Sequence, residues 1–424
     1  MKSSLKLASR LACVCLFSHS AQAQLLGPFT VHVGAGVEHD SNVLRTPESE
    51  RRSDDVASVS IGIRGDKQYG LQRFRVNAEG TRHQYSRLSA LDYSTVNYSL
   101  AWDWQVTPRF QGVLSADRRQ YRDVSRYRDL SDDESESPAG AGGRTDRTEL
   151  FEARYLIDGP WRALGGVSRT SSRSRDPQRD LDAAWDASPS TTSVHAGAAH
   201  EFASGTLMAL RLRRGEGEYR EVPTTVNSPD FRENEVSLDL KWPVTAKTAL
   251  DARLAYLERN HSASPSLNFS GPVGYATVSW DVGAKTRLIA GVASDLYSYQ
   301  ATTPGYVRSN RIFLKPVWKP TAKTSVTLRY VRENRNWRGA PAGSLESGRN
   351  DVSQWAIATF EWEPRDNIML SASARAERRN SDVPVYRYRT TTLGGSVRVN
   401  FCRRRQPPWS ACVTTRWPRP AGWT

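Results

Sequence analysis

Apolar and polar side chains alternate at every second position along most of this chain. In one segment Phe74, Val76 and Ala78 alternate with Arg73 and Arg75. The same alternation occurs over residues 29–37, 250–256, 368–377 and 392–401. Successive side chains of a β-strand point to opposite faces, so each segment is predicted to form a strand with one apolar and one polar face. The chain is therefore predicted to be all-β.

Two kinds of connection alternate between the predicted strands. Short turns are expected near residues 66–70, 107–108, 158–160, 203–205, 245–247, 284–285, 321–323 and 364–366. Longer polar loops are expected near residues 39–54, 85–92, 122–146, 174–191, 221–231, 261–272, 300–306, 335–350 and 380–386. These eight turns and nine loops connect eighteen strands, and both ends of the strand set lie on the short-turn side.

The length of the predicted strands separates a membrane barrel from a soluble sheet protein. Soluble sandwiches usually have strands of about 5–6 residues, whereas the alternation here extends over ten residues or more, as a tilted strand crossing a bilayer requires. Backbone groups in lipid must all be paired, so such a sheet has to close on itself. We predict a closed antiparallel transmembrane β-barrel of about 18 strands, with short periplasmic turns and long extracellular loops.

Aromatic residues support this choice because they gather at the short-turn ends of the predicted strands. We expect the following residues to form an aromatic girdle at the membrane interface: Trp102, Trp104, Trp161, Trp242, Trp280, Trp318, Trp362 and Phe401. Amphipathic rings favour that level of a membrane. The alternative is that they are core aromatics of a soluble β-protein. A β-propeller is disfavoured because the strands are too long and no repeat of about 40 residues is present.

The two ends of the chain differ from the body. Residues 1–23 resemble a secretory signal, with a basic start, an apolar core and the Ala21-Gln22-Ala23 cleavage pattern. Residues 402–424 form an atypical Arg/Pro/Trp-rich tail, which we interpret as a shifted frame or nonnative extension rather than a domain. Without the three basic residues of the signal and the five of the tail, the formal charge falls from +14 to +6 over the predicted barrel, residues 24–401. A nucleic-acid partner is therefore not predicted.

The polar faces of the strands are expected to line a wet lumen, since 16–18 strands leave an aqueous channel. Candidate residues of the lumen and substrate path are Arg73, Arg75, Arg154, Lys241, Asp251, Arg253, Tyr275, Arg329, Arg375 and Arg398. Acids such as Glu79, Asp103 and Glu377 are interleaved with them. Taken singly, each charge is expected to pair across strands, whereas the basic excess as a whole favours a path for a negatively charged or neutral glycan.

No catalytic or metal motif accompanies this pattern, so neither an enzyme nor a cofactor is predicted. The chain has no HExxH, no GxSxG and no P-loop, and His195 and His200 should point to opposite faces of one strand. The acidic run 129–136 lies in the longest predicted loop. We expect it to be solvated surface, with a divalent-cation site as the alternative.

Two short motifs resemble a known family. Glu38-His39-Asp40-Ser41-Asn42-Val43-Leu44-Arg45 resembles the D-x-N-V opening of barrels encoded with exopolysaccharide operons, often called EpsL, within the beta-barrel porin type 2 group. Residues 102–109 (WDWQVTPR) are similar to their aromatic-then-turn pattern. The resemblance implies that the barrel exports exopolysaccharide through the outer membrane. Its expected partners are outer-membrane lipid and lipopolysaccharide, the exopolysaccharide chain, and periplasmic and inner-membrane export components. Uptake of small anionic or sugar solutes by a general porin, or a plugged structural barrel, remain the alternatives.

Overall fold

The structure is a computed structural model that describes most of the chain. The described residues are 29–122, 143–175, 189–219, 230–263, 265–300, 304–340, 342–344 and 346–401. The predicted signal, the predicted tail and the acidic run 129–136 lie outside them. Among the described residues, no helix is long and apolar enough to cross a membrane.

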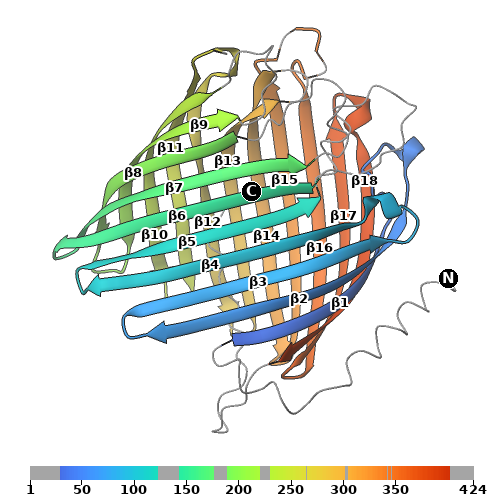
Figure 1. Cartoon of the computed structure of the whole chain (residues 1–424), viewed down its shortest axis with the longest axis horizontal. Helices are drawn as coiled ribbons and strands as arrows, with labels where there is room; N and C mark the ends of the chain where they lie inside the picture. The colour runs from blue at the N-terminus through green and yellow to red at the C-terminus, as the bar shows by residue number, and fades with distance from the viewer. Residues whose placement is uncertain are drawn as a thin grey trace.

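Eighteen strands form one sheet (Figure 1). They are β1 (Phe29–Asp40), β2 (Asp54–Tyr69), β3 (Gln72–Tyr85), β4 (Tyr93–Thr107), β5 (Phe110–Arg122), β6 (Gly143–Asp158), β7 (Trp161–Arg175), β8 (Pro189–Glu201), β9 (Leu207–Tyr219), β10 (Phe231–Thr245), β11 (Thr248–His261), β12 (Phe269–Gly283), β13 (Thr286–Gln300), β14 (Pro304–Thr321), β15 (Thr324–Arg338), β16 (Asn350–Arg365), β17 (Ile368–Ser381) and β18 (Tyr388–Phe401). In the described part of the chain, four short 3₁₀ helices lie in the loops: η2 (Glu48–Glu50), η3 (Ser89–Leu91), η5 (Pro265–Leu267) and η6 (Pro384–Tyr386).

The sheet closes on itself. Each strand is antiparallel to its neighbours in sequence, and β18 pairs with β1, where Val31 lies opposite Phe401. In Figure 1 the near strands β2–β7 cross the far strands β14–β17 at a large angle, as tilted strands on opposite walls of a barrel do. This confirms the predicted closed antiparallel barrel.

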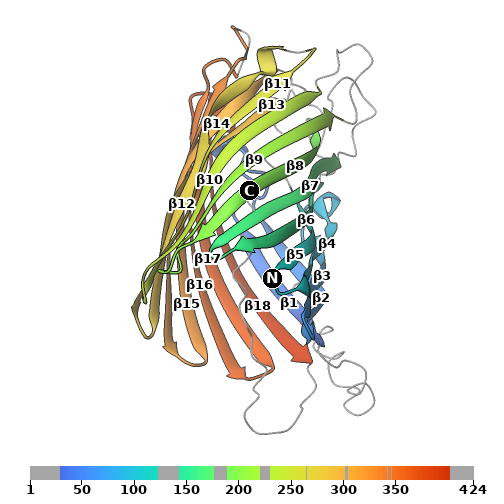
Figure 2. The same cartoon turned by 90° about the vertical axis from the view of Figure 1, so that its left-hand side faces the viewer.

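The two rims of the barrel differ in the length of their connections. Strands of 12 to 18 residues are joined at one rim by tight turns, seen at the lower left of Figure 1 for β2–β3, β4–β5 and β6–β7. Gly70 and Gly159 occupy such turns with φ of +57° and +50°, a conformation that glycine adopts without the Cβ clash. The long connections within the described residues lie at the opposite rim, and Figure 2 shows the barrel wall between the two rims.

The outer wall of the barrel is apolar. Large hydrophobic side chains stand exposed on it along every strand pair, for example Ile61, Leu212, Leu254 and Val292, each more than half exposed. A water-soluble protein would bury such a surface, whereas lipid covers it in a membrane. The opposite, inner face carries most of the charged residues, so the polarity of the two faces is that of a transmembrane barrel.

The extracellular rim near β15–β18 is held by a buried cluster. The Arg349 side chain is fully buried, with its guanidinium carbon 4.3 Å from the Trp337 ring centre and 3.4 Å from that of Tyr386 in η6. Its Nη2 donates to Asp351 at 3.0 Å, and Arg379 Nε donates to the same carboxylate at 2.7 Å. Two loops are thereby fixed to the strand ends beneath them.

Candidate functional site: the charged lumen wall

The pairing register assigns the predicted lumen residues to the inner face. On β3, Phe74 is exposed on the outer wall and stacks on Trp102 of β4, so the flanking residues Arg73 and Arg75 point inward. The same reasoning from exposed outer neighbours applies to the other candidates. The inner face holds Arg154, Lys241, Asp251, Arg253, Tyr275, Arg329, Arg375 and Arg398.

On β1–β4 and β18 three arginines of the inner face bind carboxylates of other strands. Arg73 donates two hydrogen bonds to Asp66 at 2.8 and 2.7 Å, and Arg75 donates to Asp103 at 2.6 Å. Arg398 lies 3.2 Å from Glu79, whose carboxylate also lies 2.8 Å from Nε2 of buried His32. Each of these three arginines therefore has a carboxylate partner within the wall itself.

A second network extends around Glu152 of β6. Its buried carboxylate lies 2.6 Å from Arg154, 3.5 Å from Arg211 and 3.6 Å from His195. Three strands, β6, β8 and β9, thus supply groups to one acid. His200 of the same strand as His195 packs on the outer wall, 4.6 Å from the ring of Trp161, as the alternation predicted.

The network continues on β9–β12. Arg213 bridges Glu233 and Glu235 at 2.8 Å each, and Arg259 Nε donates to Glu233 at 2.8 Å. Arg253 also binds Glu235. Nearby, the hydroxyl of Tyr275 donates to Asp251 at 3.0 Å. Lys241 lies exposed at the short-turn end of β10, opposite Asp251 in the register.

On β15–β17 the inner face carries an aromatic ring between two arginines. The guanidinium carbons of Arg329 and Arg375 lie 4.8 and 5.4 Å from the ring centre of Trp355. Arg375 donates to Glu377 at 2.7 Å, and the hydroxyl of Tyr388 donates to the same acid at 2.7 Å. Arg45 from the first loop reaches this acid at 3.9 Å.

Sequence reasoning omitted several members of these networks, notably His32, Glu233, Glu235 and Trp355. Alternation places each of them on the inner face, so the face was predictable although the partner was not. Their partners depend on the stagger between strands, which sequence periodicity does not specify.

The aromatic residues predicted for the membrane interface lie on the outer wall. Trp102, Trp161, Trp242, Trp280, Trp318, Trp362 and Phe401 are each 40–51% exposed there. Trp104 differs, being only 8% exposed. The Trp104 ring covers Gly112 of β5, where a Cβ would collide with it. It also stacks against the Phe151 ring, with 5.8 Å between the two ring centres. Trp104 therefore fills a notch in the wall instead of facing lipid.

The described residues contain no group of three or more His, Cys, Asp or Glu that could hold a metal ion. The charged residues of the inner face are arranged as arginine–carboxylate pairs along the wall.

A closed eighteen-stranded barrel with an apolar outer wall, an aromatic girdle and a charged lumen defines an outer-membrane β-barrel of the porin type. Many solved structures resemble it, and three of them are compared with it as follows. OccK2 (OpdF) of Pseudomonas aeruginosa in complex with glucuronate is 13% identical, with a TM-score of 0.48 over 91% of this chain and 100% of that chain. The outer membrane protein OpdK of the same organism is 12% identical, with a TM-score of 0.47 over 89% of this chain and 100% of that chain.

A BenF-like porin from Pseudomonas fluorescens is 11% identical, with a TM-score of 0.47 over 89% of this chain and 100% of that chain. No protein-family model matches the chain, and no curated protein matches it. The assignment to the porin type therefore rests on the geometry of the barrel itself, and the resemblance to exopolysaccharide-operon barrels rests on its two short motifs.

Proposed function

We propose that this barrel is a water-filled channel of the outer membrane for small acidic and neutral sugar-like solutes. The observation that carries the proposal is the closure of eighteen strands around an inner face lined with arginine–carboxylate pairs. A barrel of this size encloses an aqueous lumen. The charged groups that line such a lumen select among the solutes that enter it.

The paired arginines suit solutes rich in oxygen. A guanidinium has five N–H donors, and a single carboxylate uses at most a few of them. Arg75 and Arg375, with side chains 29% and 39% exposed, keep part of this surface open to the lumen. Their remaining donors can bind hydroxyl or carboxylate oxygens of a passing solute without breaking the ion pairs of the wall.

Reversal of charge on the inner face tests this proposal. We expect the triple variant Arg73→Glu, Arg75→Glu, Arg375→Glu to shift selectivity toward cations, because it replaces three lumen cations with anions. Selectivity is measured from the reversal potential of single channels in planar bilayers under a salt gradient.

The matched control carries the same charge change on the outer wall of the barrel, as Arg332→Glu, Arg378→Glu and Arg389→Glu. It should leave the reversal potential unchanged. A barrel without any conductance would contradict the channel proposal and favour a plugged structural role.

Export of exopolysaccharide is the second candidate, and the motif at residues 38–45 favours it. Inward Tyr275 and Trp355 would supply aromatic faces along a glycan path. Under this candidate the partners are the polysaccharide chain and the periplasmic and inner-membrane export components. Loss of secreted polysaccharide in a clean deletion strain, with unchanged uptake of small solutes, would favour export over the porin function.

A further inference from the structure

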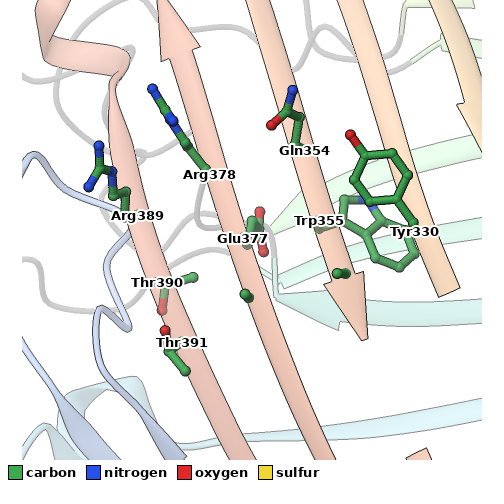
Figure 3. Close-up of a pocket in the computed structure, with 10 residues that line it drawn as sticks. Tyr330, Gln354, Trp355, Glu377, Arg378, Arg389, Thr390 and Thr391 are labelled. Carbon is green, nitrogen blue, oxygen red and sulfur yellow. The ribbon is translucent and has the colours of Figure 1, made fainter. Parts of the chain in front are cut away.

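Three arginines and a glutamine form one row across the outer wall of β15–β18. The register places Arg332 opposite Gln354, Gln354 opposite Arg378, and Arg378 opposite Arg389. All three arginines are exposed. Figure 3 shows Gln354, Arg378 and Arg389 in front of their strands, whereas Trp355 and Glu377 lie behind them toward the lumen. The row therefore faces the membrane.

A shallow hollow lies along this row. It has a volume of about 400 Å³ and is lined by residues of all four strands. The small side chains of Ala356, Ala376 and Thr391 line it beside Tyr330, Gln354, Arg378 and Arg389. Trp355, Glu377 and Thr390 complete the lining, and Figure 3 shows Trp355 and Glu377 behind their strands, on the lumen side. A hollow that combines small side chains with arginines on the outer wall of a membrane barrel can hold a lipid headgroup.

The arginines of the row have no acidic partner in the part of the chain that the structure describes. Among the residues that the structure describes, no ion pair is recorded for Arg332, Arg378 or Arg389, and Arg378 donates to the amide oxygen of Asn380 at 2.9 Å. Arg378 and Arg389 lie directly opposite each other, an arrangement of like charges that is destabilising on its own. An anion bound between them would remove this repulsion.

The row lies close to the extracellular edge of the apolar band. Gln354 is eight residues from Trp362 of the girdle on the same strand, which is roughly 26 Å along the strand and roughly 20 Å across the membrane at a tilt of about 40°. The apolar band of such barrels is about 25 Å tall. Arginine side chains extend toward the polar side of an interface, so these guanidiniums reach its edge.

Strands β9–β11 lack such a row at the same level. Asn234 is also eight residues from a girdle tryptophan, Trp242, and lies between Arg214 and Glu258. There one base and one acid share the level. The arginine row of β15–β18 thus differs from this level of β9–β11, where a base and an acid occur together.

We propose that this hollow binds the phosphorylated glucosamine headgroup of lipid A, the anchor of lipopolysaccharide. Arg378 and Arg389 would bind one phosphate, since guanidinium groups bind phosphate through paired N–H donors. Gln354 offers an amide to the hydroxyls of the sugar, and the floor of Ala356 and Ala376 leaves room for the ring. Clusters of basic residues at a membrane surface bind anionic headgroups in this way.

Contacts from two extracellular loops hold the site in shape. Asn42 of the first loop donates its amide to the backbone oxygen of Arg389 at 3.1 Å. The buried Arg349–Tyr386 stack fixes the loop that joins β17 to β18. A site that is rigid before binding loses less conformational freedom when its ligand arrives.

Binding of bisphosphorylated lipid A to the full chain in detergent micelles tests the proposal. We expect the variant Arg332→Gln, Arg378→Gln, Arg389→Gln to weaken this binding by on the order of a hundredfold. The matched control Arg214→Gln, at the same level on the outer wall of β9, should change the affinity by no more than about twofold. Dephosphorylated lipid A should bind the unaltered protein as weakly as bisphosphorylated lipid A binds the triple variant.

Two results would overturn the proposal. One is a triple variant that retains full affinity for bisphosphorylated lipid A while running as a folded barrel on unheated gels. The other is equal binding of phosphatidylglycerol, which would assign the row to any anionic headgroup. Single-channel conductance of the triple variant should be unchanged, so failure of lipid binding and failure of the channel function are distinguishable.

Discussion

Arginines occupy two different electrostatic settings on β15–β18. On the inner face, Arg375 donates to Glu377 at 2.7 Å, and Arg335 donates to Glu333 at 2.8 Å. Arg378 directly follows Glu377 in the sequence, and it lies on the outer wall without a carboxylate partner among the described residues. Figure 3 shows Glu377 and Arg378 on opposite sides of the same strand. Carboxylates of the barrel itself neutralise these arginines on the inner face. On the outer wall, the neutralising anion has to come from the membrane.

The difference follows from what each face contacts. The inner face meets water and solutes that exchange continually, so carboxylates built into the wall keep its arginines in place between passages. The outer face meets a leaflet of phosphorylated glycolipid that stays beside the barrel. An unpaired arginine at that level is neutralised by its lipid surroundings, and it costs stability only where the anion is missing.

The largest effect should follow from removing the acid that holds two arginines at the extracellular rim. Asp351→Ala leaves Arg349 and Arg379 without their shared carboxylate in a fully buried site. Removal of one partner from a buried pair costs about 3–5 kcal/mol. We expect this loss in the free energy of unfolding, measured by urea titration of the barrel in lipid vesicles.

Ser309→Ala is a suitable control for the Asp351 variant, because it removes one hydrogen bond to Glu333 and leaves every ion pair intact. It should cost about 1 kcal/mol. A smaller loss for Asp351→Ala than for Ser309→Ala would show that the rim cluster does not hold the strand ends.

Removal of one acid from the inner face should sharpen the comparison through conductance. Glu377→Gln releases Arg375 from its carboxylate and takes one negative charge from the lumen. We expect a shift of selectivity toward anions, with roughly 1–2 kcal/mol lost in the free energy of unfolding. The reversal potential under a salt gradient is the measurement. The neighbouring change Arg378→Gln removes a charge from the outer wall and should leave that potential unaltered.

The smallest effect is expected where the outer wall contacts lipid without charge. Trp362 is 44% exposed at the periplasmic girdle. Trp362→Ala therefore loses only the packing contacts that the buried part of the ring makes with the wall. We expect Trp362→Ala to lower the free energy of unfolding in lipid vesicles by about 1 kcal/mol, with no change in ion selectivity.

Trp104→Ala should lower the free energy of unfolding by more, about 3 kcal/mol, because its ring is buried over Gly112. Equal losses for the two variants would argue against this distinction.

Much of the barrel could be predicted because a strand that separates lipid from water must alternate. The alternation of residues 368–377 identified β17, and the turn near residues 245–247 identified the joint between β10 and β11. The candidate site was predictable only by face. Arg73 and Arg375 were assigned to the inner face, whereas the clustering of Arg213, Glu233 and Glu235 was not foreseen.

The sequence by itself determined which side of each strand meets lipid, because the period of two is a local property of the extended backbone. Only the tertiary structure decided which residues are neighbours, since those depend on the stagger between strands and on closure of β18 against β1. For this reason Trp104 is covered instead of facing lipid, and three arginines from separate segments form one row.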